Sequence, residues 1–212
     1  MGVNDTMIPW QVGDYDDLLQ RPITLVASQG ALAKGTVLGK IKIGAAVGAK
    51  VAGGAGGGNI SAVSAGKDAK VGVYTLTCIA KATGLGTFQV NDPQSNLMVP
   101  VTAAVGGTPY VSTQINFTLT SAGSDFEVGD KFTVTVAAGS GQYQTALSAA
   151  TDGSADACAV LPVAVTVTSA VTMDAIVAGT VYENNLVFGT GSTAANTRAS
   201  LWANNIFPVL QK

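Results

Sequence analysis

The chain has 212 residues, of which 47% are apolar and 11% are charged, and its formal net charge is −2. It contains no histidine, which removes the usual base of serine and cysteine hydrolases and the commonest metal ligand. The small negative charge gives no electrostatic basis for binding nucleic acid or an anionic membrane. Val, Thr and Gly are frequent, and this composition predicts a mainly β fold built from many short strands.

Residues 1–22 are predicted to form an extended N-terminal arm, in which Pro9, Gly13 and Pro22 disfavour regular structure. The arm carries large apolar side chains of the type that anchor protein interfaces. These candidate binding residues are Trp10, Val12, Tyr15, Leu18 and Leu19. Two interpretations are open. The arm packs on its own domain as an irregular strand, or it adds to a strand of a partner whose pockets receive these side chains.

The sequence shows no pattern for export or for a membrane-spanning helix. Its first residues lack the basic and apolar regions of a signal peptide, so we expect synthesis in the cytoplasm. The longest apolar run, residues 158–167, is too short to span a bilayer and contains Pro162.

The stretch 23–43 alternates apolar and polar residues on both sides of a central break, which predicts a pair of short strands joined by a turn. The following segment, 44–59, is so rich in Gly and Ala that we predict a flexible linker. A phosphate-binding loop is not supported, because neither a Lys-Ser/Thr pair nor an amphipathic helix follows the glycines.

Residues 59–136 predict a separate small β sandwich, because short strand patterns alternate with turn residues at regular spacing. Asp125, Glu127 and Asp130 lie in one of the predicted turns, where we expect solvated side chains rather than calcium ligands. A second small-residue segment, 137–141, follows the sandwich.

Two linkers on either side of a β module indicate an insertion into a host domain, since insertions are best tolerated at exposed loop tips. The predicted insert is 49–138, and the predicted host joins residues 23–48 to 139–212.

The second half of the host is expected to contain a turn at 152–154, buried strands within 157–167, and one short helix near the C-terminus. Ser192 or Thr193 is the predicted N-cap of that helix. Asn204 and Asn205 are expected to end it, before a last short strand at 206–209.

Taken in order, the host motifs resemble the bacteriophage head decoration (capsid-stabilising) protein family of the lambda type. The first motif is S-Q-G-A-L-A-K-G-T-V-L-G-K at residues 28–40. The others follow in the family's order: D-G-S at 152–154, a glutamate–asparagine segment at 181–186, G-T-G-S-T-A-A at 189–195, and I-F at 206–207. The resemblance covers the host and leaves the insert outside the family pattern.

The resemblance implies a β-clip-like core and a structural virion protein that is not an enzyme and needs no cofactor. It implies a homotrimer that binds the major capsid protein on the outer surface of the expanded head, at three-fold and quasi-three-fold positions, and stabilises it. It also implies that the arm lies across the capsid protein. We expect neither a nucleic-acid partner nor a membrane partner.

The runner-up function is an adhesin-like β module that binds host cells or glycans, because such modules share this Thr-, Val- and Gly-rich composition. A pair of catalytic carboxylates has no positive support, since the chain's glutamates, Glu127 and Glu183, lie in different segments. Cys78 and Cys158 lie in apolar runs that favour buried free thiols, although the sequence leaves a single disulfide open.

Overall fold

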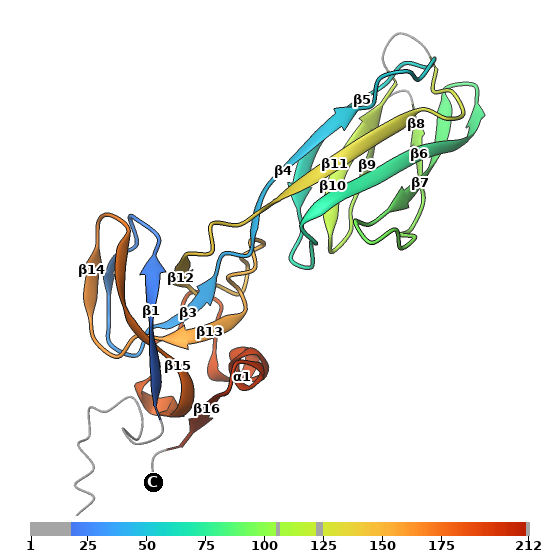
Figure 1. Cartoon of the computed structure of the whole chain (residues 1–212). Helices are drawn as coiled ribbons and strands as arrows, with labels where there is room; N and C mark the ends of the chain where they lie inside the picture. Colours follow the sequence, from blue (N-terminus) through green and yellow to red (C-terminus); the bar gives the residue numbers. More distant parts are fainter. Residues whose placement is uncertain (1–17, 105–106, 122–124, 211–212) are drawn as a thin grey trace, which may run out of the picture. The chain divides into compact units, whose positions relative to one another are not determined.

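Figure 1 shows the computed structural model of the chain, which describes residues 18–104, 107–121 and 125–210. The fold is mainly β, with a single short α-helix near the C-terminus of the described chain, as the sequence predicts. The chain divides into two compact units. The host unit contains the residues up to Ile41 and from Gly141 onward, and the inserted unit is Lys42–Ser140.

The host unit is built around a small closed sheet. Its strands are β1 (Leu19–Leu25), β2 (Gly30–Leu32), β3 (Val37–Lys40), β12 (Tyr143–Thr145), β13 (Ala157–Val160), β14 (Val165–Val167), β15 (Val171–Tyr182) and β16 (Ile206–Val209). The order β1-β12-β3-β13-β15-β16 closes on itself, because β1 also pairs with β15. The resulting small barrel leaves few open strand edges, while β2 and β14 form a separate two-stranded ribbon.

Three strands of the host unit are buried on both faces. Neighbouring residues of β3, Val37 and Leu38, belong to two different hydrophobic cores. The same division holds for Ala159 and Val160 on β13 and for Ala175 and Ile176 on β15. A strand with two buried faces needs a continuous apolar run instead of alternation, which is the pattern around residues 157–161.

The helix α1 (Ala194–Ala203) begins at Thr193, one of the two predicted N-caps. The Thr193 side chain accepts a hydrogen bond from the Asn196 backbone N–H, and the Asn196 side chain accepts one from the Thr193 N–H, which completes a capping box. Leu201 is the buried apolar residue of the helix. Asn205, at φ +60°, ends the turn after the helix and leads into β16, as predicted.

The inserted unit is a β sandwich whose two sheets share one hydrophobic core. Its strands are β4 (Ile43–Lys50), β5 (Asn59–Ala65), β6 (Gly72–Ala82), β7 (Leu85–Asn91), β8 (Val101–Ala104), β9 (Thr108–Tyr110), β10 (Ile115–Thr120) and β11 (Lys131–Ala138). One sheet has the order β4-β11-β6-β7-β8 and the other β5-β10-β9. Phe88, Phe126 and Phe132 meet edge-to-face in the core, the geometry that aromatic rings favour.

The predicted flexible linker at 44–59 is wrong for its first part, because residues 43–50 form strand β4 and pair with β11. The small residues serve close packing instead of flexibility. A Cβ at Gly48 would lie 2.7 Å from the Val63 side chain, so glycine lets β4 approach β5 closely. The junctions of the insert consequently move from 48/49 and 138/139 to 41/42 and 140/141.

The short strands expected within residues 23–43 are present, but they do not pair with one another. β1 and β3 are not neighbours, because β12 lies between them, and β2 pairs with β14. Pro22, assigned to an irregular arm, lies inside β1 opposite Asp174 of β15. Proline is tolerated there because β12 pairs with β1 only at Leu25, so no ladder hydrogen bond from residue 22 is lost on that side.

Candidate functional site

The host motifs make direct contact with one another, although the insert separates them in sequence. A Cβ at Gly39, in the first motif, would lie 1.8 Å from the carbonyl oxygen of Ser154 in the D-G-S turn. A Cβ at Gly35 would lie 1.9 Å from the carbonyl oxygen of Asn185, in the short 3-10 helix η2 (Glu183–Asn185). Both glycines are therefore required by backbone-to-backbone packing between motifs.

The D-G-S turn is fastened to the barrel by side-chain hydrogen bonds. Gln144 Nε2, on β12, donates to Asp152 Oδ2 at 2.8 Å and to the Ser154 hydroxyl at 2.7 Å. The Ser154 backbone N–H donates to Asp152 Oδ1 at 2.9 Å, and Ser154 is fully buried. These contacts make the turn a structural clamp on β3 and β12.

The side chain of Gln29, in the first motif, also connects two strands of the barrel, at the end of β1. Its amide nitrogen donates to the carbonyl oxygens of Val26 and Tyr143, at 3.1 and 3.2 Å. Its amide oxygen accepts the Thr145 backbone N–H at 2.9 Å. Gln29 therefore satisfies backbone groups of β12 where the barrel ladder is short, a role that no local sequence signal indicates.

An ion pair connects the glutamate–asparagine segment to the helix. Arg198 Nη2, on α1, donates to Glu183 Oε2 at 2.5 Å. The Arg198 side chain is 43% exposed and that of Glu183 is 19% exposed, so solvent weakens the pair. Its contribution is chiefly to orient η2 against α1.

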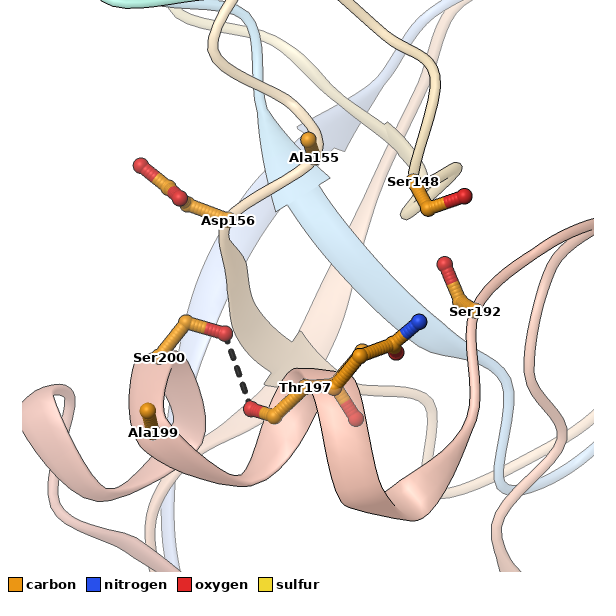
Figure 2. Close-up of a pocket in the computed structure, with 8 residues that line it drawn as sticks. Ser148, Ala155, Asp156, Ser192, Thr197, Ala199 and Ser200 are labelled. Carbon is orange, nitrogen blue, oxygen red and sulfur yellow. Dashed lines mark hydrogen bonds between the residues drawn. The ribbon is translucent and has the colours of Figure 1, made fainter.

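A cavity of about 470 Å³ lies between α1 and the loop that follows β12 (Figure 2). The lining side chains are small or polar: Ser148, Ala155, Asp156, Ser192, Asn196, Thr197, Ala199 and Ser200. The Ser192, Thr197 and Ser200 hydroxyls donate to backbone carbonyls of the same unit, at 2.8, 2.7 and 2.8 Å. The Ser192 hydroxyl thus ties the segment before α1 to the loop after β12, and the other two hydroxyls bond within the helix and its cap.

The predicted arm residues are only partly described by the structure. Trp10, Val12 and Tyr15 lie outside the described residues. Leu18 is half-buried and packs against the core beneath α1, so part of its apolar surface is used within the host unit. Leu19 is the first residue of β1 and remains 46% exposed.

The carboxylates of Asp92 and Asp130, in the inserted unit, are buried. For Asp130 this is contrary to the expectation of a solvated turn residue. Asp130 accepts the backbone N–H groups of Gly56 and Glu127, at 3.1 and 2.8 Å. Asp92 accepts the Lys70 ammonium at 2.6 Å. That hydrogen bond, together with donation from Asn96, holds the pKa of Asp92 well below its ordinary value.

The described residues were compared with the requirements of a metal site and of a reactive thiol. Among residues 18–104, 107–121 and 125–210, no group of three or more Asp, Glu or Cys side chains is placed to hold a metal ion. Cys78 is buried and Cys158 half-buried, and neither forms a disulfide. Burial raises the pKa of the Cys78 thiol, which lowers its reactivity. No helix in the described chain combines the length and hydrophobicity needed to cross a bilayer.

Comparison with known proteins finds no matching family model and no matching curated protein. Solved structures that are similar include FlgL from Xanthomonas campestris, with 17% identity and a TM-score of 0.35 over 52% of this chain and 34% of that chain. The flagellar junction protein FlgL from Legionella pneumophila has 12% identity and a TM-score of 0.36 over 50% of this chain and 37% of that chain. This chain thus spans little more than a third of the flagellar proteins, and similarity at this level does not indicate a shared function.

Proposed function

We propose that this protein is a capsid decoration protein of a bacteriophage. It binds the outer surface of the expanded head as trimers at three-fold and quasi-three-fold positions, with the major capsid protein as its partner, and it stabilises the shell. The protein is made in the host cytoplasm and becomes part of the virion. Its role is structural, and it carries out no reaction.

The observation that carries this proposal is the contact between the motifs that resemble the decoration family. Gly39 lies against Ser154, and Gly35 lies against Asn185, so three motifs separated in sequence form one packed group. The fourth motif caps α1 through Thr193, and the fifth begins β16, which pairs with β15. This mutual packing supports treating the motifs as parts of one structural unit.

The trimer is supported by the sparse charge of the chain and by its exposed apolar residues. Only 11% of the residues are charged. In the host unit, Val187 and Trp202 are 42% and 53% exposed. Apolar surface of this kind is usually covered by a partner in a stable assembly.

The test is cryo-microscopy of heads with and without the protein. Trimeric knobs at the three-fold and quasi-three-fold positions are expected only on heads that carry it, and these heads should resist heat better. Analytical ultracentrifugation that finds monomers both free in solution and released from heads would contradict the trimer. Binding to host cells or glycans, without binding to expanded capsids, would support the adhesin alternative instead.

A further inference from the structure

Strands β1, β15 and β16 lie at one end of the host unit (Figure 1). They carry a strip of uncharged side chains. Paired residues on neighbouring strands place their side chains on the same face of a sheet, as do alternate residues along one strand. The strip follows from three pairs: Leu19 with Ala178, Phe207 with Thr180, and Val209 with Tyr182. We call these six residues the β15–β16 strip.

The opposite face of the same strands is the core face. Val181 and Ile206 are fully buried and belong to the core beneath α1, and Pro208 is buried with them. The strip therefore points away from the core. Leu19, Phe207 and Val209 are 46%, 46% and 39% exposed, and no member of the strip is charged. An exposed strand face normally carries polar side chains, so this face is suited to burial against a partner.

The edge of β16 limits how that partner binds. The Gly179 N–H donates to the Asn205 carbonyl at 2.9 Å, which directs the backbone groups of residues 205 and 207 toward β15. The backbone of Pro208 is consequently directed away from β15, and proline has no N–H to offer there. A partner strand cannot complete a hydrogen-bond ladder along this edge, so the contact is made by the side chains of the strip.

The position at which the arm joins β1 indicates which partner covers the strip. Leu19 is the first residue of β1, and the segment 1–17 joins the described chain one residue before it. The proposed capsid-binding arm therefore leaves the fold beside the strip. A surface bound by the arm lies within reach of the strip, and an uncharged strip suits an apolar surface rather than a charged one.

We propose that the β15–β16 strip is a second part of the capsid-binding surface and packs against an apolar area of the major capsid protein next to the arm. This inference rests on the proposed function. The arm contributes an extended segment, whereas the strip contributes a rigid face that fixes the orientation of the host unit on the shell. The anchors of the rigid face are Phe207 and Val209 on β16 and Leu19 on β1.

The test uses the full chain and expanded capsids assembled without it. The double variant Phe207→Ser/Val209→Thr is compared with Val111→Thr/Val163→Thr, which removes exposed apolar surface elsewhere, since Val111 and Val163 are 80% and 55% exposed. We expect the strip variant to bind capsids at least tenfold more weakly and the control to bind within twofold of the wild type. The oligomeric state and the unfolding temperature of both should match the wild type.

Each remaining outcome has a definite meaning. Wild-type affinity in the strip variant overturns the inference and leaves the proposed function standing. Loss of oligomers, with unchanged capsid binding per folded chain, assigns the strip to contacts between copies and also overturns the inference. A wild-type chain that does not bind capsids overturns both proposals. If the double variant does not fold, Leu19→Ser on β1 decides the question, and undiminished binding by that variant contradicts the inference.

Discussion

Asp92 fastens two loops of the inserted unit through a single buried carboxylate. It accepts the Lys70 ammonium at 2.6 Å and the backbone N–H groups of Gln94 and Asn96, at 2.9 and 2.8 Å. Lys70 precedes β6, whereas the other two donors follow β7. All of these bonds favour the ionised carboxylate, which explains why the pKa of Asp92 is lowered.

The lowered pKa of Asp92 predicts acid-sensitive stability. In the unfolded chain an aspartate titrates near pH 3.9, and in the fold Asp92 titrates below that value, so its stabilisation is present above about pH 4. It is lost progressively as the pH falls further. Thermal unfolding measured from pH 6 to pH 2 should show this loss, and Asp92→Asn should flatten the acid limb while lowering stability at neutral pH. The control Asp125→Asn removes an exposed carboxylate and should retain the acid limb.

Gly39 is a second position where one atom decides the packing. A Cβ there would overlap the Ser154 carbonyl oxygen, and a backbone atom cannot rotate out of the way as a flexible side chain can. We expect Gly39→Ala to lower the free energy of unfolding by roughly 3 kcal/mol or more. Gly53→Ala is the control. It has open space around the new Cβ but a φ of +99°, and should cost about 1–2 kcal/mol. Chemical denaturation measures both, and equal losses would contradict the contact between the motifs.

The elements with clear local signals are predicted well from sequence. β10 and β11 alternate buried residues with half-buried or exposed ones, as the pattern of Ile115, Phe117 and Leu119 indicates. α1 begins at a Thr that matches capping statistics, and β16 ends the described host where an Ile-Phe pair predicts a strand. These elements depend on interactions within a few residues, which a single sequence records.

The elements that could not be predicted depend on distant partners. β4 is composed of small residues because it packs closely on β5, and composition alone cannot distinguish this use of Gly and Ala from a flexible linker. β12 separates β1 from β3, yet more than a hundred residues lie between β3 and β12. For the candidate binding surface, the sequence indicates the arm anchors but not Phe207 and Val209. Their exposure depends on the register of β16 with β15.

The N-cap of α1 gives a test at the level of one helix. Thr193→Ala removes the side-chain acceptor of the Asn196 N–H and should destabilise the host unit by about 1 kcal/mol. Thr193→Ser keeps the hydroxyl and should cost much less. Calorimetry of the full chain can follow both variants. If serine is as damaging as alanine, the methyl group of Thr193 matters and the capping bond does not.

The two units should fold independently, because the core of the inserted unit consists entirely of residues from Ile43 to Val136. The ends of the insert also meet. The Ile41 N–H donates to the Gln142 carbonyl at 2.9 Å, and the Gly141 N–H donates to the Ile41 carbonyl at 3.0 Å. A short Gly-Ser turn can therefore replace Lys42–Ser140 without stretching the host.

We expect the host without its insert to fold cooperatively and to bind expanded capsids, and Lys42–Ser140 expressed alone to unfold as a separate cooperative unit. Circular dichroism and capsid co-sedimentation measure these outcomes. A second deletion, of 49–138, is the matched comparison. It splits β4 and removes all of β11, which leaves the remaining part of β4 without its partner strand. A folded host that no longer binds capsids would show that the insert takes part in attachment.

The arm is predicted to contribute most of the capsid affinity, and the structure sets where to cut it. Leu18 packs on the host core and Leu19 begins β1, so removal of residues 1–17 keeps every described residue of the host. Removal of 1–22 also takes away the first part of a barrel strand. Ordering an extended arm costs roughly 1–2 kcal/mol per residue. Large side chains such as Trp10 and Tyr15 must therefore become buried to offset that cost. Asp14, Asp16 and Asp17 are expected to face basic groups of the partner and to set register more than affinity.

Deletion of residues 1–17 should leave the unfolding temperature unchanged and weaken binding to expanded capsids severely, because the extended segment can no longer add to a strand of the capsid protein. Trp10→Ala should weaken binding several-fold by itself, whereas Gln11→Ala, its polar neighbour, should have little effect. Titration of capsids with fluorescently labelled protein gives all three affinities. If the truncated protein saturates capsids at the same concentration as the full chain, the arm packs on its own domain and attachment depends on the folded host alone.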